Sequence, residues 1–175
     1  APADPLEAAQ LFEQLVVAKG PWYIRLNRGG ERVVSEGALP VQIGAGSILK
    51  KGSQATIFSI GNITEVALEA AALLENDGIS TEVIHLHTLK PLDNGIIKDR
   101  ARTRKIIVTL EEHTINGGLG SAVSEVLAEN GLAVPFRRLG VEDQYFSFIG
   151  KQDFLRTKAG LSATAVAETI KKLCK

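Results

Sequence analysis

Short apolar runs alternate with stretches of helical spacing over most of the chain. Continuous apolar and β-branched runs are typical of strands buried on both faces, and they predict strands at residues 47–50, 55–60, 80–86, 105–110 and 134–139. Apolar residues at helical spacing predict helices at residues 64–76, 94–103, around 122–127 and 163–173. Strands that alternate with helices indicate βαβ crossovers, so the sequence predicts an α/β domain with a mostly parallel sheet.

The first forty residues do not complete such a domain. An Asp-Pro pair at residues 4–5 is typical of a helix start, and it is followed by a predicted helix at 6–19 and a predicted short strand at 22–26. One helix and one strand bury too little apolar surface to fold alone. We therefore expect residues 1–41 to be the last unit of a neighbouring domain plus a linker, and residues 42–175 to be a complete domain.

Composition excludes several classes of function. Twenty basic and twenty acidic residues cancel, which leaves no electrostatic footprint for binding nucleic acid or an anionic membrane. No apolar run approaches the length of roughly 20 residues that a membrane span needs. The single Cys174 fits a reducing compartment, and we expect a cytoplasmic protein. The chain contains no methionine, so we expect a processed product or a trimmed fragment.

Residues 105–127 carry the densest set of candidate functional groups. The predicted strand at 105–110 ends in Glu111, Glu112 and His113, at the edge of the sheet where α/β proteins usually bind ligands. These residues could form an acid–base set or a metal site. Three consecutive residues at a strand end rarely converge on one atom, so a polar contact across an interface is favoured, with His113 as the best candidate.

A glycine-rich turn, Gly117-Gly118-Leu119-Gly120, opens the next helix. Bare backbone N–H groups at a helix start can bind an anion, and glycine lets a phosphate approach. The spacing matches neither the dinucleotide fingerprint nor the P-loop. Close packing of the turn against a neighbouring strand is the alternative interpretation, and the motif alone favours it.

Histidines and arginines provide two further candidates. His85 and His87 lie on one face of a strand, but a zinc site needs three or four ligands. Hydrogen-bonded histidines at the end of the sheet are therefore favoured over metal ligands, and no metal site is predicted.

Arg28 follows the predicted strand and precedes two glycines, which suits a clamp for a phosphate or carboxylate. A surface arginine without such a role is the alternative interpretation. The sequence has no nucleophile elbow, P-loop or Ser/His/Asp order, so no catalytic residue is predicted.

Several segments resemble the C-terminal part of transketolase-like, thiamine-diphosphate-dependent enzymes. They are YIRLNRGG (23–30), GAGSILKKG (44–52), ATIFSIGN (55–62), LKPLD (89–93) and VTLEEHTINGGLGSAVSE (108–125). Their order and spacing cover nearly the whole chain. The resemblance is closest to the C-terminal section of split transketolases. The enzyme 1-deoxyxylulose-5-phosphate synthase and the β subunits of 2-oxo acid dehydrogenases share the LKPLD and EEH-type segments.

The resemblance implies a domain division and an activity. Residues 1–41 would end a pyrimidine-binding domain, and residues 42–175 would form the transketolase C-terminal domain, a three-layer α/β fold with helices on both faces of the sheet. The implied reaction is transfer of a two-carbon ketol unit between sugar phosphates with thiamine diphosphate and a divalent metal, Mg or Ca. The glutamate that activates the cofactor belongs to an earlier part of the pyrimidine domain. We therefore expect the chain alone to be inactive and to bind no cofactor.

The resemblance also implies partners and site residues. Arg28 matches the family arginine that binds the phosphate of the sugar substrate. Glu112, His113, Gly117 and Gly118 are expected at an interface or in domain packing. The expected partners are the remaining transketolase section, with its pyrophosphate and pyrimidine domains, and a second copy in a homodimer.

Two other functions stay open on the sequence alone. A free-standing α/β module could bind a nucleotide or another phosphate at the turn over residues 117–120. A purely structural assembly domain could supply dimer contacts and nothing else.

Overall fold

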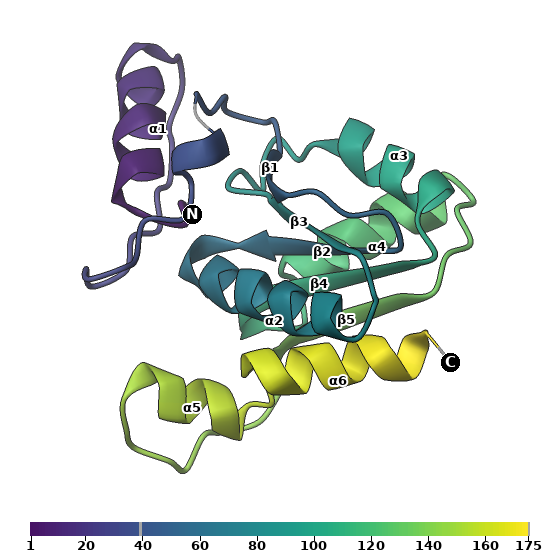
Figure 1. The fold of residues 1–175 in the computed structure, drawn as a ribbon. Helices are drawn as coiled ribbons and strands as arrows, with labels where there is room; N and C mark the ends of the chain where they lie inside the picture. Colours follow the sequence, from purple (N-terminus) through teal and green to yellow (C-terminus); the bar gives the residue numbers. More distant parts are fainter. Residues whose placement is uncertain (39, 175) are drawn as a thin grey trace.

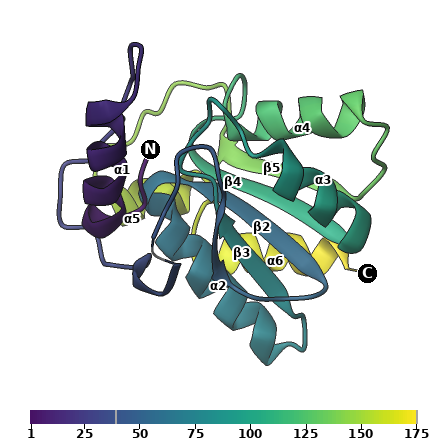
Figure 2. The same ribbon diagram turned by 90° about the horizontal axis from the view of Figure 1, so that it is seen from above.

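The computed structural model describes residues 1–38 and 40–174, which form a five-stranded sheet with helices on both faces (Figures 1 and 2). The strands, in the spatial order β1-β3-β2-β4-β5, are β1 (Ser47–Lys50), β2 (Ala55–Ile60), β3 (Thr81–His85), β4 (Ile106–Thr114) and β5 (Phe136–Val141). The α-helices are α1 (Pro5–Val17), α2 (Thr64–Asn76), α3 (Asn94–Thr103), α4 (Leu119–Glu129), α5 (Gln152–Lys158) and α6 (Ala163–Leu173). No helix within the described ranges is long and apolar enough to cross a membrane.

Strand β2 lies at the centre of the sheet, and all of its residues are buried. It pairs in parallel with β3 on one side, where Ile57 lies opposite Val83, and with β4 on the other, where Ile57 lies opposite Val108. Strand β5 continues the parallel arrangement beside β4, and β1 runs antiparallel along the outer edge of β3. The predicted mostly parallel sheet is therefore confirmed.

Two apolar clusters fill the space between the sheet and its helices. Ile57 points to the face covered by α2 and α6, where it joins a cluster that includes Ile170. The next residue, Phe58, points to the face covered by α3 and α4, where it joins a cluster that includes Val123. Because α2 and α4 cover opposite faces, the carboxyl ends of β2 and β4 border the crevice at which sheets of this kind bind ligands.

Most predicted elements lie where the sequence pattern indicated, with changes at their ends. The bounds of β1, β2, α2 and α3 match the prediction. Strand β4 continues beyond Leu110 because Thr114 still pairs with Val141 of β5, and β5 begins at Phe136, two residues later than predicted. Leu73 of α2, which the pattern predicts to face inward, is 39% exposed.

Residues 22–26 do not form the predicted strand. They have no regular secondary structure, and the described sheet includes none of them. A strand needs a neighbouring strand to bond its backbone N–H and C=O groups, and the segment has no such neighbour in the described part of the chain. The predicted helix–strand remnant is therefore a helix followed by an irregular segment.

Helix α1 is attached by polar side chains to the segment that leads into β1. The amide Nε2 of Gln14 donates to the carbonyl of Val41 at 2.8 Å, and its Oε1 accepts the N–H of Ile43 at 3.0 Å. Gln10 accepts the N–H of Val41, also at 3.0 Å. These bonds fix α1 beside the sheet domain, in the position that Figure 1 shows.

A buried arginine connects α5 to the sheet domain. Arg156 is 4% exposed, and its Nη1 donates to Glu65 of α2 at 2.8 Å while its Nη2 donates to Glu112 of β4 at 2.9 Å. Gln152 also donates to Glu112, at 3.0 Å. One guanidinium therefore connects α2, β4 and α5.

Replacing Arg156 by methionine should destabilise the chain, because two carboxylates would lose their shared cation. We expect a loss of about 2–4 kcal/mol in the free energy of unfolding, somewhat below the cost for a fully buried pair because both glutamates still reach water. Urea titration followed by circular dichroism measures this loss. The exposed Arg102 of α3 provides a matched control, and an Arg156→Met loss no larger than that of Arg102→Met would contradict the assignment.

Candidate functional site

A pocket of about 1090 Å³ lies between the N-terminal residues and the carboxyl ends of the central strands. Ile60 at the end of β2, His87 after β3 and Glu111 near the end of β4 line one side of it. Residues of α1 and the segment after it line the other side. The pocket therefore lies at the crevice between β2 and β4, the usual place for a ligand in this class of fold.

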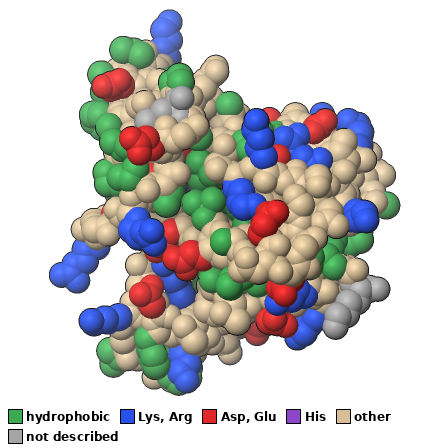
Figure 3. Space-filling view, in the orientation of Figure 1, with side chains coloured by type: hydrophobic (Ala, Val, Ile, Leu, Met, Phe, Trp, Pro, Cys, Tyr) green, Lys and Arg blue, Asp and Glu red, His purple; other side chains and the backbone are tan. Residues whose placement is uncertain are grey.

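The wall that the N-terminal residues contribute is mostly apolar. Phe12, Tyr23 and Leu26 line it, and they are 59%, 86% and 63% exposed. Figure 3 shows hydrophobic side chains gathered in the hollow between the N-terminal part and the sheet domain. Large apolar side chains that gather at an open surface mark a region that binds a ligand, a membrane or another protein surface.

The glycine-rich turn before α4 packs against β4 and binds a carboxylate from that strand. Glu111 accepts the N–H of Leu119 through Oε2 and the N–H of Gly120 through Oε1, each at 2.8 Å. A Cβ on Gly118 would overlap the Glu111 carboxylate, and Gly117 has a φ of 76°, in the left-handed region. Because the chain's own side chain already binds the N–H groups at this helix start, the geometry favours close packing over an anion site.

The three polar residues at the end of β4 have separate surroundings. Glu111 is 1% exposed and bonds the turn, whereas Glu112 bonds Arg156. His113 is exposed, and its Nδ1 donates to the carbonyl of Thr114 at 2.9 Å. Glu111 and His113 line the pocket. The sequence pattern gave no signal that would separate Glu111 from its neighbours, because its partners are backbone groups of the next helix.

Two of the arginines after α1, Arg25 and Arg28, lie in different places. Arg28 is exposed and is not among the residues that line the pocket. Gly29 and Gly30 follow it with φ values of 106° and 92°, so bare backbone lies next to its side chain. Arg25 is half-buried and lines the pocket, and its Nη2 would lie 3.3 Å from a Cβ built on Gly61. The structure therefore brings Arg25 to the edge of the sheet and leaves Arg28 outside the pocket.

The two histidines after β3 also have separate partners. His85 is fully buried and bonds Glu7 and Gly61. Because Glu7 and His85 are 78 positions apart in the sequence, no local pattern indicates this contact. His87 is 2% exposed, and its Nδ1 lies 2.7 Å from Oγ1 of Thr88. Its Nε2 has no hydrogen-bond partner among the described residues. Burial lowers the pKa of His87 to about 4, so its imidazole is neutral at pH 7.

The buried imidazole of His87 should make stability depend on pH. Its pKa lies below the ordinary value of 6.5, so the stability from the neutral form is fully present above pH 6.5 and is lost as the pH falls toward 4. We expect a loss of order 2 kcal/mol between pH 7 and pH 5, measured by urea titration at both values. His87→Gln should reduce this loss, whereas His113→Gln, at an exposed position, should retain it. An unchanged pH dependence in His87→Gln would refute the assignment.

Comparison with known proteins gives concordant matches. Residues 44–166 match the model of the transketolase C-terminal domain. The putative transketolase C-terminal section of Methanocaldococcus jannaschii is 37% identical over 97% of this chain and 53% of its own length. The 6-deoxy-6-sulfo-D-fructose transketolase subunit SqwH of Clostridium sp. (strain MSTE9) is 40% identical over 93% of this chain and 51% of its own length. The 1-deoxy-D-xylulose-5-phosphate synthase of Heliobacterium modesticaldum is 39% identical over 99% of this chain and 27% of its own length.

A solved structure agrees with these matches. Its description is "Split gene transketolase, inactive beta4 tetramer". It superposes on this chain with a TM-score of 0.88 and is 37% identical to it, and the match covers 98% of this chain and 55% of that chain. This chain therefore spans about half the length of the transketolase relatives and about a quarter of the synthase. The family match covers most of the chain, including β1 to β5 and the glycine-rich turn. The chain belongs to the transketolase C-terminal domain family.

Proposed function

We propose that this chain is the C-terminal section of a transketolase-like enzyme that transfers a two-carbon ketol unit between sugar phosphates. The observation that carries the proposal is the length of the match: relatives described as a transketolase C-terminal section and a transketolase subunit align over 97% and 93% of the chain. These alignments cover more of the chain than the match to the family model does, because that match begins at residue 44. Because the chain spans about half of each relative, we infer that it is inactive alone and works with the remaining section.

The N-terminal residues fit the end of a neighbouring domain. We infer that residues 1–41 end the pyrimidine-binding domain and that residues 42–175 form the C-terminal domain. The start of the family match at residue 44 and the apolar wall over α1 and residues 21–26 support this division. In the complete enzyme, we expect the remaining part of the pyrimidine domain to cover that wall.

The chain's own residues do not fit a site for thiamine diphosphate and its metal. No three His, Cys, Asp or Glu side chains in residues 1–38 and 40–174 lie close enough together to hold a metal ion. The helix start at the glycine-rich turn is already bound by Glu111, so its N–H groups are not open to a diphosphate. We therefore propose that the remaining section holds the cofactor and metal, while this chain contributes substrate binding and assembly.

Arg28 is the proposed ligand of the substrate phosphate. Its side chain is exposed, and the two glycines that follow leave room for a phosphate to approach. A guanidinium can donate two parallel charge-assisted hydrogen bonds to a phosphate, worth about 1.5–3 kcal/mol.

Replacing Arg28 by alanine in the complete enzyme should raise the KM for phosphorylated sugars roughly 10- to 100-fold, because a charge-assisted contact is lost. Steady-state kinetics with a phosphorylated and an unphosphorylated acceptor measures the effect, and the unphosphorylated acceptor should be unaffected. The matched control is Arg32→Ala, which removes an exposed arginine of the same segment that pairs with Glu69 at 3.7 Å. An unchanged KM in Arg28→Ala would remove the assignment.

The apolar wall should bind the remaining section of the enzyme. We expect Phe12→Ala to weaken binding of that section roughly tenfold, because truncating an interface aromatic commonly costs more than 1 kcal/mol. Isothermal titration calorimetry of this chain against the remaining section measures the affinity. Leu73→Ala, at an exposed leucine of α2, should leave it unchanged. Equal affinities for wild type and Phe12→Ala would argue against this interface, and sedimentation of the assembled complex tests the expected pairing of two copies.

A second candidate is the C-terminal part of a 1-deoxy-D-xylulose-5-phosphate synthase. The 39% identity over 99% of the chain to the Heliobacterium modesticaldum synthase supports it as strongly as the transketolase matches support the first candidate. Product analysis of the complete enzyme separates the two. Formation of 1-deoxyxylulose 5-phosphate supports the synthase, and ketol exchange between sugar phosphates supports the transketolase.

A further inference from the structure

The segment that carries Arg25 and Arg28 is irregular, yet its far end is bonded to the start of α1, the helix that it follows. We call residues 18–33 the arginine segment, which begins after α1 and returns to residues 34–35. Asp4 and Glu7, at the start of α1, are 3% and 0% exposed. Asp4 bonds the return of the segment, and Glu7 bonds the sheet.

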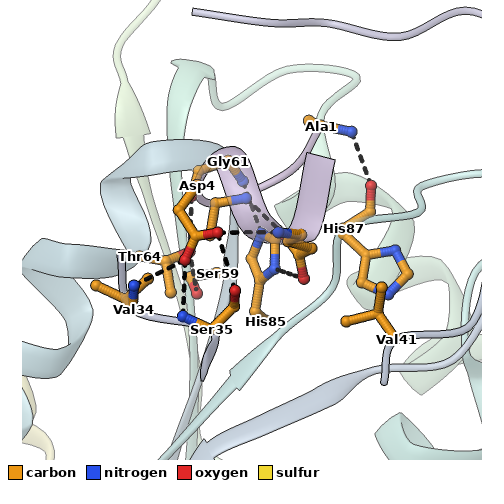
Figure 4. A network of polar contacts seen from close by, with 12 residues as sticks. Ala1, Asp4, Val34, Ser35, Val41, Ser59, Gly61, Thr64, His85 and His87 are labelled. Atoms are coloured by element: carbon orange, nitrogen blue, oxygen red, sulfur yellow. Dashed lines mark hydrogen bonds and ion pairs between the residues drawn. The ribbon is translucent and has the colours of Figure 1, made fainter. Parts of the chain in front are cut away.

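Asp4 closes the arginine segment into a loop. Its Oδ2 accepts the N–H groups of Val34 and Ser35, each at 2.7 Å, and its Oδ1 accepts the hydroxyl of Ser35 at 2.9 Å (Figure 4). Oδ1 also accepts the N–H of Glu7 at 3.0 Å, which caps α1. Burial raises the pKa of Asp4, but these hydrogen bonds together lower it by more than burial raises it. The pKa of Asp4 therefore lies below its usual value. The carboxylate is therefore ionised and accepts four hydrogen bonds.

Glu7 docks the same helix turn onto the sheet. Its Oε1 lies 3.0 Å from Nδ1 of His85, and its Oε2 accepts the N–H of Ala3 at 2.6 Å. On the far side of the ring, Nε2 of His85 accepts the N–H of Gly61 at 3.0 Å (Figure 4). Because Nε2 accepts a hydrogen bond, the ring proton is on Nδ1 and is donated to Glu7.

Only a carboxylate satisfies every donor in this arrangement. A glutamine at position 7 has one oxygen and one amide nitrogen, so its nitrogen would face either the N–H of Ala3 or the Nδ1–H of His85. The amide N–H of the glutamine would then face another N–H donor in a fully buried position, and neither donor would have an acceptor there. Burial raises the pKa of Glu7, but its bonds to His85 and Ala3 lower the pKa below the usual value, which agrees with an ionised side chain.

Gly61 joins this pair to the arginine segment. Its N–H bonds His85, and Nη2 of Arg25 would lie 3.3 Å from a Cβ built on Gly61. Gly61 belongs to the short 3-10 turn η2 (Gly61–Ile63) after β2, and its φ is 76°. Gly61 therefore lies between the Glu7–His85 pair and Arg25 at the sheet edge.

We propose that Asp4 and Glu7 are positioning residues, which hold the arginine segment against the carboxyl edge of the sheet so that Arg28 meets the substrate phosphate in one geometry. This inference rests on the proposed function, because Arg28 is the group that they position. Buried charged groups contribute less to stability than apolar groups of the same volume. A role in geometry explains why two carboxylates occupy the base of this segment.

The test uses the complete enzyme with Glu7→Gln, Asp4→Ser and the Arg28→Ala variant. Glu7→Gln should raise the KM for a phosphorylated acceptor roughly five- to tenfold, while kcat and the KM for an unphosphorylated acceptor change less than about twofold. Asp4→Ser retains a side chain that caps α1 but loses the bonds to residues 34–35, so it should reproduce the effect if Glu7→Gln does not fold. Glu13→Gln, at an exposed position of the same helix, is the matched control.

A double variant separates positioning from a general loss of structure. If Glu7 acts through Arg28, then Glu7→Gln should add no further increase in KM when Arg28 is already alanine. An equal loss of kcat with both acceptors, or an additive effect in the double variant, would overturn the inference. If Arg28→Ala raises the KM for the phosphorylated acceptor but Glu7→Gln and Asp4→Ser leave this KM unchanged, only the positioning role is overturned. An unchanged KM in Arg28→Ala would instead overturn the proposed role of Arg28 in binding the substrate phosphate.

Discussion

The pairing of β2 with β3 and β4 is the constraint on which the other features of the structure depend. This strand is buried along its whole length, and its residues alternate between the two apolar clusters. Its carboxyl end leads into Gly61, which bonds His85 of the neighbouring strand and lies against Arg25. The register of one central strand therefore determines where the N-terminal residues dock. The pocket, the glycine-rich turn and the arginine segment are all placed relative to that end of β2.

Local patterns predicted the sheet domain because each of its elements buries its own apolar residues. The strand at 55–60 and the helices at 64–76 and 163–173 needed only hydrophobic spacing and turn signals. Prediction failed for residues 22–26, because a strand depends on a neighbour that residues 1–38 and 40–174 do not supply. The antiparallel direction of β1 could not be predicted either, since strand direction depends on pairing rather than on composition.

The candidate site was harder to predict because long-range contacts define it. Glu111 and Glu112 are adjacent in sequence, but one bonds the start of α4 and the other bonds Arg156. The same limit applies to Glu7, whose burial and partner follow from a contact with β3 across the fold. The glycine-rich turn is a partial exception. Its spacing already favoured packing over an anion site, and the carboxylate bound there provides the physical reason.

The carboxylate at the start of α4 also determines how charge is distributed around the pocket. A helix N-terminus carries a partial positive charge, and Glu111 offsets it within the wall formed by the sheet domain. Arg25 lies in the wall formed by the N-terminal residues. Lys90, in the loop after β3, also lines the pocket, so cationic side chains on both sides of it lie near one buried carboxylate. Because opposite charges attract in such a cleft, an acidic group that enters it would favour these two cations over the helix start, whose N–H groups Glu111 already occupies.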